Sequence, residues 1–286
     1  MKRPRSSHYV HGTAPSEQRR LSRMNDLLNE ASLRELSVRP GDRILDLGSG
    51  LGQFSRAMAR AAGPEGRVVG VERSPGQRAQ ARALARAAGE GALVEFRAGN
   101  AEDPPLAPEE WGSFDLAHAR FLLEHLPEPL AAVRVMVRSV RPGGRVVLTD
   151  DDHDLLRFHP ACPPLERVWT AYVASYARHG NDAFVGRRLV GLLREAGARP
   201  HRARWIFFGG CASEPHFSAL VANLEGVLRS GREDALATGA IDRAAFDRGL
   251  AELRRWSRAP DATFWYGLPW AEGVAPFSPR RARRST

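Results

Sequence analysis

The chain has 286 residues, 43% of them hydrophobic, which is enough for one large core or two modest ones, and a single α/β domain with helical additions is the economical interpretation. No apolar run approaches the length of a membrane span, and residues 1–7 carry no apolar segment of the signal-peptide kind, so we expect a cytoplasmic protein. Two cysteines, Cys162 and Cys211, are too few for a disulfide framework or a cysteine-rich zinc site.

The net charge of +9 raises the question of a nucleic-acid partner. Part of the excess lies at the two ends, where residues 2–5 and 280–284 are basic, and we expect a disordered basic tail at 276–286. The other arginines are scattered through alanine-rich helices, and no basic segment is interleaved with aromatic residues. A monomer or homodimer that acts on a small molecule is therefore favoured over a nucleic-acid-binding protein.

The first half of the chain alternates between strand and helix patterns. An N-terminal tail and cap helix are expected over 1–37, ahead of the Pro40-Gly41 break. Further along, the predicted strands are 43–47, 67–72, 93–98, 114–120 and 145–150, and the predicted helices are 53–62, 75–88 and 129–140. Such alternation predicts a parallel sheet with helices on both faces, and ligands bind such sheets beyond the carboxyl ends of the strands.

Helices become more frequent after residue 150. The predicted elements there are helices 163–179 and 187–196, a sixth strand at 205–208, helices 217–228 and 243–256, and a last strand at 262–268. The expected fold is α/β, a doubly wound, mostly parallel seven-stranded sheet with an N-terminal helical cap and a helical insert before the last strand. The main domain would cover 38–275 and include a helical lid at about 155–200 and 212–258.

A glycine-rich turn follows the first predicted strand, where Gly48, Gly50 and Gly52 alternate with other residues. Glycines let the backbone approach a ligand, and Glu72 at the end of the second strand can hold the two hydroxyls of a ribose. The third glycine comes two residues after the second, not three as in the fingerprint that binds a pyrophosphate. Asp46 before the turn would repel phosphates, but it can attract the cationic groups of S-adenosylmethionine.

This turn resembles the D-x-G-x-G-x-G motif of the class I S-adenosylmethionine-dependent methyltransferases, and the resemblance covers about residues 38–198. It implies a Rossmann-like methyltransferase fold, whose last strand runs antiparallel between the two strands before it in sequence, and S-adenosyl-L-methionine as cofactor. Where the family usually has G-D-A-E to hold adenine, this chain has Gly99-Asn100-Ala101-Glu102. The Asn100 side chain could still bind the adenine, or it could be only a turn residue.

Residues 114–148 resemble the ubiquinone/menaquinone-methyltransferase-like branch of that family, which acts on small molecules. The branch commonly has L-H-H-L-P where this chain has Leu123-Glu124-His125-Leu126-Pro127. Glu124 therefore replaces the first histidine of a pair, which weakens the transfer of a catalytic role. His118 and Arg120 are expected beside the methionine end of the cofactor, although one of them could instead face only the neighbouring helices.

An N-terminal segment, Tyr9-Val10-His11-Gly12, resembles the Y-x-x-G segment that folds over the cofactor in related small-molecule methyltransferases. Tyr9 would then reach the cofactor carboxylate. The alternative is that this N-terminal segment is flexible and has no such role. The residues expected to bind the cofactor are Tyr9, Asp46, Gly48, Ser49, Gly50, Gly52, Gln53, Glu72, Arg73, Asn100, Ala101, Glu102, His118 and Arg120.

Four aspartates and a histidine follow the fifth strand, as Asp150-Asp151-Asp152-His153-Asp154. Such a group could bind a divalent metal or deprotonate a nucleophile. The further acidic residues that metal-dependent catechol methyltransferases need are not evident, so we expect no metal. Asp152 or His153 is expected to line the substrate cavity, and the alternative is that most of the cluster caps the next helix.

Methyl transfer is an in-line displacement, so the enzyme mainly supplies alignment, exclusion of water and a base. The candidate bases are His125, His118 and His153, because imidazole can accept a proton near neutral pH. Aromatic residues of the lid favour a compact apolar acceptor, although each could equally be a core residue; they are Trp169, Tyr172, Phe217, Trp256, Phe264, Trp265 and Trp270.

The predicted function is methylation of a small, fairly apolar organic acceptor, with oxygen favoured over nitrogen or carbon. Two other functions stay open from the sequence. One is an RNA or protein methyltransferase that uses the arginines, and the other is a non-catalytic S-adenosylmethionine-binding module.

Overall fold

The computed structural model describes residues 28–277. Residues 28–36 are helical, and the rest of the predicted cap helix, Tyr9 and most of the predicted C-terminal tail lie outside the described residues. Within residues 28–277, no helix combines the length and the apolar character that crossing a membrane would require.

The first half forms the predicted parallel sheet. Its strands are β1 (Arg43–Leu47), β2 (Arg67–Glu72), β3 (Val94–Ala98), β4 (Phe114–Arg120) and β5 (Val140–Thr149), which lie in the order β3-β2-β1-β4-β5. Residues 44–47 of β1 are buried, as expected for a strand covered on both faces. The turns that follow β1, β2 and β4 therefore open at one edge of the sheet.

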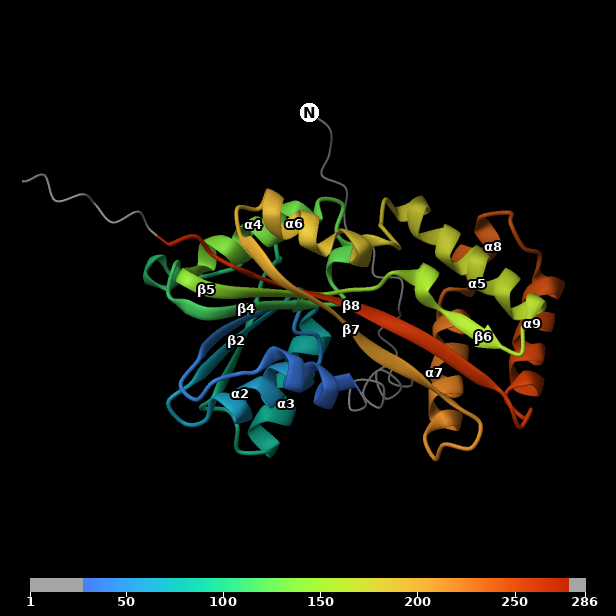
Figure 1. Cartoon of the computed structure of the whole chain (residues 1–286). Coiled ribbons are helices and arrows are strands. Elements are labelled where there is room, and N and C mark those ends of the chain that lie inside the picture. The colour runs from blue at the N-terminus through green and yellow to red at the C-terminus, as the bar shows by residue number, and fades with distance from the viewer. Residues whose placement is uncertain (1–27, 278–286) are drawn as a thin grey trace, which may run out of the picture.

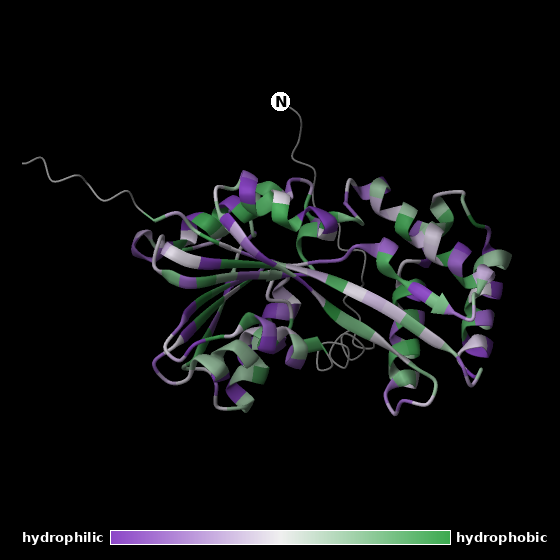
Figure 2. Ribbon diagram, viewed as in Figure 1, coloured by the Kyte–Doolittle hydropathy of each residue, from purple (hydrophilic) through white to green (hydrophobic). Residues whose placement is uncertain are grey.

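Helices cover both faces of this sheet (Figure 1). On one face lie α2 (Gln53–Ala62) and α3 (Pro75–Ala87), and on the other lie α4 (Pro129–Ser139) and α6 (Leu189–Glu195). Figure 2 shows hydrophobic residues concentrated in the central strands and mixed polar and apolar residues on the helices around them. This is the pattern of amphipathic helices that pack on a buried sheet.

The second half extends the sheet and adds a helical unit. Its elements are β6 (Arg157–His159), α5 (Pro163–Ser175), β7 (Arg199–Cys211), α7 (Phe217–Ser230), α8 (Arg232–Ala237), α9 (Arg243–Trp256) and β8 (Thr263–Val274). Strand β8 runs antiparallel to β7 along one side and to β5 and β6 on the other. We call α5, α7, α8 and α9 the helical lid, because they share a core of their own beside the end of the β7–β8 ribbon. The lid predicted at about 155–200 also included α6, but α6 packs on the parallel sheet instead.

The predicted fold class is confirmed, with corrections to single elements. The sheet has eight strands rather than seven, because three residues of β6 pair with β8. Strand β7 was predicted only over 205–208, since its first half is rich in arginine; pairing along β8 holds that polar half in the sheet. Strand β5 begins at Val140, before an irregularity in its pairing with β4, and α8 was not predicted.

Candidate active site

A cavity of about 990 Å³ lies at the carboxyl ends of the parallel strands and reaches the inner face of the β7–β8 ribbon and the lid helices α5 and α7. It brings together most of the residues singled out in the sequence. The predicted site residues that line it are Asp46, Gly48, Ser49, Gly50, Gln53, Glu72, Arg73, Asn100, Ala101, Glu102, His118, Arg120, His125 and His153. Gly52 does not line the cavity, and Tyr9 lies outside the described residues.

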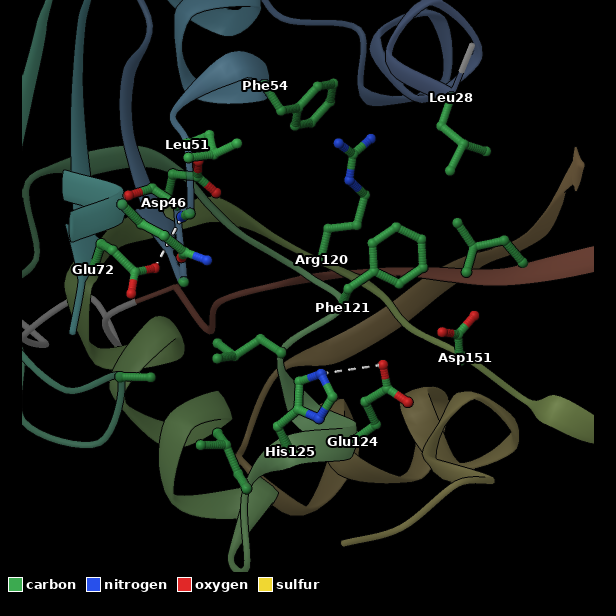
Figure 3. A pocket seen from close by; sticks show the side chains of 18 of the residues that line it. Leu28, Asp46, Leu51, Phe54, Glu72, Arg120, Phe121, Glu124, His125 and Asp151 are labelled. Carbon is green, nitrogen blue, oxygen red and sulfur yellow. Dashed lines mark hydrogen bonds and ion pairs between the residues drawn. The ribbon is translucent and has the colours of Figure 1, made fainter. Parts of the chain in front are cut away.

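The two ends of the cavity differ in character. Figure 3 shows Glu72 and Asp46 on one side and Glu124 and Asp151 on the other, with Arg120 and Phe121 between them. The first side is formed by the ends of β1 and β2 and is called the nucleoside end below. The second side, which adjoins the lid, is called the acceptor end.

Different structural constraints favour glycine at the three positions of the turn. Gly48, Gly50 and Gly52 all have positive φ angles, of 73°, 54° and 71°, which favour residues without a Cβ atom. A Cβ at Gly52 would lie 2.3 Å from the buried ring of Phe96, so this glycine serves packing between α2 and β3 and not ligand access. Gly48 and Gly50 line the cavity itself.

Backbone amides hold the Glu72 carboxylate at the nucleoside end. The Gly50 N–H donates to one carboxylate oxygen at 2.9 Å, and the Ser74 N–H donates to the other at 2.6 Å. Each oxygen keeps acceptor capacity for a further donor. Nearby, the buried Ser49 hydroxyl has no hydrogen-bond partner among the described residues. Such an arrangement fits the expected nucleoside cofactor, because a ribose diol can donate to Glu72 and a polar ligand atom can satisfy Ser49.

Asp46 is nearly buried and hydrogen-bonded inside the protein. One carboxylate oxygen accepts a hydrogen bond from the Ser55 hydroxyl, and the other lies 2.8 Å from His118 Nδ1. The His118 ring also packs on Phe54, with ring centroids 4.9 Å apart. His118 is therefore oriented by Asp46.

Arg120 brings a positive charge to the middle of the cavity. Its guanidinium lies 4.3 Å from the centroid of the Phe54 ring and donates to Asn29 Oδ1 and Ser32 Oγ at 2.8 and 3.2 Å. Burial lowers the pKa of Arg120 to about 10, an effect that the charge of Asp46 opposes. Both His118 and Arg120 line the cavity, as their spacing of two along β4 allows.

The sequence left open whether Asn100 lies at the cofactor site or is only a turn residue. In the structure it lines the cavity and also forms a turn, in which its backbone carbonyl accepts from the Asp103 N–H at 3.3 Å. Its assignment to adenine stays a prediction.

Three side chains from two separate segments, one beyond β4 and one beyond β5, meet at the acceptor end. One carboxylate oxygen from each of Glu124 and Asp151 and one ring nitrogen of His153 lie within 4.8 Å of one another. His153 Nε2 is 3.2 Å from a Glu124 oxygen, and the Tyr266 hydroxyl donates to Asp151 at 2.6 Å. This spacing could hold a cation or a proton-bearing group of a substrate. The sequence did not reveal this arrangement, because Tyr266 reaches it only through the β8 pairing.

Burial controls the protonation of this group. Burial, together with repulsion from Asp150, raises the pKa of Glu124 well above its usual range. Burial and repulsion from Glu124 raise the pKa of Asp151 to about 7. Burial lowers the pKa of His153, although the neighbouring aspartates oppose this. The imidazole is therefore neutral near neutral pH, as a proton acceptor needs to be.

The rest of the acidic cluster has structural roles. Asp150 is buried and accepts the Leu122 and Leu123 N–H groups at 3.0 and 2.7 Å. Asp152 and Asp154 both bind Arg187, and Asp152 also caps a short helix at 153–155. Of the two residues expected to line the substrate cavity, His153 does so and Asp152 does not.

The predicted aromatic wall is only partly present in the cavity. Trp169, Tyr172 and Phe264 line it, and Tyr266 and Phe208 add two further rings from the paired positions of the ribbon. The others lie elsewhere: Phe217, Trp256 and Trp270 are core residues, and Trp265 is 44% exposed. Side-chain alternation on β8, whose register the sequence could not supply, decides which rings face inward.

The raised carboxyl pKa values predict a pH dependence of stability. Folded Asp151 keeps its proton up to about pH 7, whereas an unfolded Asp keeps it only to about pH 4. The folded state is therefore progressively destabilised as the pH rises from about 4 to about 7. Asp151→Asn should remove up to about 4 kcal/mol of this loss. Urea unfolding at both ends of the range measures it, with Asp154→Asn as the matched control. An equal pH dependence in wild type and Asp151→Asn would contradict the assignment.

Known methyltransferases resemble this chain in sequence. A family model described as a methyltransferase domain matches residues 45–148. The chain is 32% identical over 177 residues to a ubiquinone biosynthesis O-methyltransferase of Xanthomonas axonopodis pv. citri, an alignment that covers 59% of this chain and 69% of that protein. It is 35% identical over 166 residues to an uncharacterized 37.1 kDa protein in transposon TN4556 of Streptomyces fradiae, covering 58% of this chain and 46% of that protein.

Solved structures resemble the fold. A putative methyltransferase from Bacillus halodurans superposes with a TM-score of 0.56 at 17% identity, over 86% of this chain and 98% of that one. The [4+2]-cyclase SpnF superposes with a TM-score of 0.53 at 20% identity, over 96% of this chain and 90% of that one. At such identities the likeness concerns the fold alone, and one fold can carry different reactions, as the names of these two proteins indicate.

Proposed function

Because the chain belongs to the class I S-adenosylmethionine-dependent methyltransferases, we propose that it methylates an oxygen atom of a small, fairly apolar organic acceptor. The observation that supports this proposal best is the acceptor end of the cavity. Aromatic and aliphatic side chains surround a compact polar group there, which suits a small organic molecule with one reacting polar atom. The enclosing rings would also exclude water from the reaction.

Glu72, Ser49 and Gly50 are the residues proposed to hold the nucleoside of S-adenosylmethionine. Bound there, the cofactor supplies an electrophilic methyl group on sulfur. Arg120 lies between this end and the acceptor end, and His118 lines the cavity beside Asp46; both would align the methionine part. Their positions make the alignment of donor and acceptor the main contribution of the protein.

The histidine best placed to assist is His153. Its ring contacts Glu124 on one side and lies 3.4 Å from the Tyr266 hydroxyl on the other, and it lines the acceptor end. As the acceptor oxygen gains the methyl group, its proton would pass to the neutral imidazole and sulfur would keep the electron pair of the broken bond. His118 is hydrogen-bonded to Asp46, and His125 lies 3.5 Å from the other Glu124 oxygen.

Glu72→Ala is predicted to weaken S-adenosylmethionine binding by about 1–3 kcal/mol, because it removes a charge-assisted contact to the ribose. Isothermal titration calorimetry measures the change. Glu65→Ala, on the loop before β2 and outside the cavity, serves as the control and should leave the affinity unchanged. An unaltered dissociation constant in Glu72→Ala would argue against the proposed cofactor site.

Transfer to oxygen is tested with S-adenosylmethionine and a library of small aromatic alcohols, acids and amines, analysed by mass spectrometry. We expect O-methyl products, and a loss of roughly 10²–10⁴-fold in their rate for His153→Gln. If all products carry the methyl group on nitrogen or carbon, the oxygen preference is ruled out. An unchanged rate for His153→Gln would rule out the histidine's part while leaving the oxygen preference intact.

A further inference from the structure

The acceptor end has an acidic wall formed by two carboxylates. Glu124 lies just beyond β4 and is 1% exposed, and Asp151 lies just beyond β5 and is partly exposed to the cavity. Figure 3 shows both side chains at the same end, directed toward the same space. The wall therefore belongs to the cavity itself and not to the outer surface of the protein.

No arginine neutralises these two carboxylates within residues 28–277. Glu124 makes its ion-pair contacts with His125 and His153, and Asp151 accepts a hydrogen bond from Tyr266. The neighbouring Asp152 and Asp154 differ, because both bind Arg187 outside the cavity wall. The acceptor end therefore presents oxygen atoms that can accept hydrogen bonds. Near neutral pH its potential is only partly negative, because the pKa of Glu124 is well above its usual range and that of Asp151 is about 7, and no arginine of residues 28–277 pairs with either side chain.

Aromatic rings enclose this potential. The His153 ring lies edge-on to Trp169, Tyr172 and Tyr176, with ring centroids 5.3, 5.9 and 5.0 Å apart. The Tyr172 and Tyr176 hydroxyls lie 3.0 Å from each other. Electrostatic interactions are stronger in such an enclosed, poorly hydrated space than in water.

We propose that Glu124 and Asp151 select the acceptor by charge, an inference that rests on the oxygen-methylating function proposed above. The site takes a neutral hydroxyl, which donates a hydrogen bond to one of the carboxylates. It rejects molecules whose reacting group is a carboxylate or a phosphate, because a further anion would lie beside two acidic groups that no arginine of residues 28–277 neutralises. Acids and alcohols of equal size are thereby distinguished.

The test measures binding to the complex with S-adenosylhomocysteine, so it does not depend on turnover. The probes are 4-nitrophenol, whose absorbance distinguishes the neutral phenol from its anion, benzoate and phenyl phosphate. Wild type is expected to bind neutral 4-nitrophenol at least about tenfold more tightly than either anion. The double variant Glu124→Gln/Asp151→Asn should lose this preference, and Asp154→Asn should keep it.

Three results with the organic probes would overturn the proposal. They are equal or tighter binding of benzoate or phenyl phosphate by wild type, an unchanged preference in the double variant that still binds S-adenosylhomocysteine, and no binding of 4-nitrophenol. Binding of Mn²⁺ by wild type that the double variant loses would also overturn it, because a cation would then occupy the space. If O-methyl products still form while the preference is absent, the selection by charge fails and the proposed function stands.

Discussion

Gly52→Ala is expected to lower the free energy of unfolding by about 2–5 kcal/mol. Two costs combine at this position. The φ angle of 71° lies in the left-handed region, where a Cβ costs about 1–2 kcal/mol. The new methyl group would also lie 2.3 Å from Phe96 Cζ and 3.0 Å from Ala81 Cβ, and overpacking of this kind costs about 1–3 kcal/mol.

Gly63→Ala separates the two costs. Gly63 ends α2 with a φ angle of 72°, and nothing lies within 4 Å of the position that its Cβ would take. This variant should lose only the conformational part, about 1–2 kcal/mol. Urea unfolding gives both values, and cofactor binding should weaken only in Gly52→Ala, because Gly52 is the last residue of the turn and caps α2. Equal destabilisation of the two variants would mean that Phe96 does not constrain this position.

Glu272→Ala is expected to lower the free energy of unfolding by about 3–5 kcal/mol, the cost of removing one partner from a buried ion pair. Glu272 is 3% exposed on β8. Arg145 on β5 donates to it at 2.7 Å, and Arg202 on β7 lies 3.4 Å away. Its loss would leave these cations facing an empty space at the centre of the three strands.

Glu252→Ala is the matched control for that prediction. Glu252 pairs with Arg255 on the surface of α9, where the arginine side chain is 81% exposed, and such pairs contribute about 0–1 kcal/mol. Chemical denaturation of the two variants compares a buried and an exposed glutamate–arginine pair. A loss below about 1 kcal/mol in Glu272→Ala would show that the strand pairing does not depend on this network.

The elements that the sequence predicted well are those with a local cause. Strand β1 and helix α2 have the predicted bounds, because a continuous apolar run and a glycine turn mark their ends. The first half of β7 was missed for the opposite reason. Its arginines favour no strand by themselves, and pairing with β8 imposes the extended conformation.

The candidate site divides in the same way. The residues of the nucleoside end lie in short motifs at the ends of β1 and β2, so the sequence could predict that they lie together. The comparisons confirm S-adenosylmethionine as the cofactor, and the roles of the single residues stay predictions. At the acceptor end, the sequence named His153 but did not foresee that Glu124, Asp151 and Tyr266 surround it.

The sequence by itself determined the methyltransferase fold and its cofactor, because a strand, its turn and the next carboxylate are contiguous enough to act as a local signature. Only the tertiary structure decided which groups meet at the acceptor end of the cavity. Those groups lie beyond β4, beyond β5 and on β8, and their approach depends on strand order and on which face of β8 turns inward. Both properties arise from long-range pairing, which no single stretch of residues encodes.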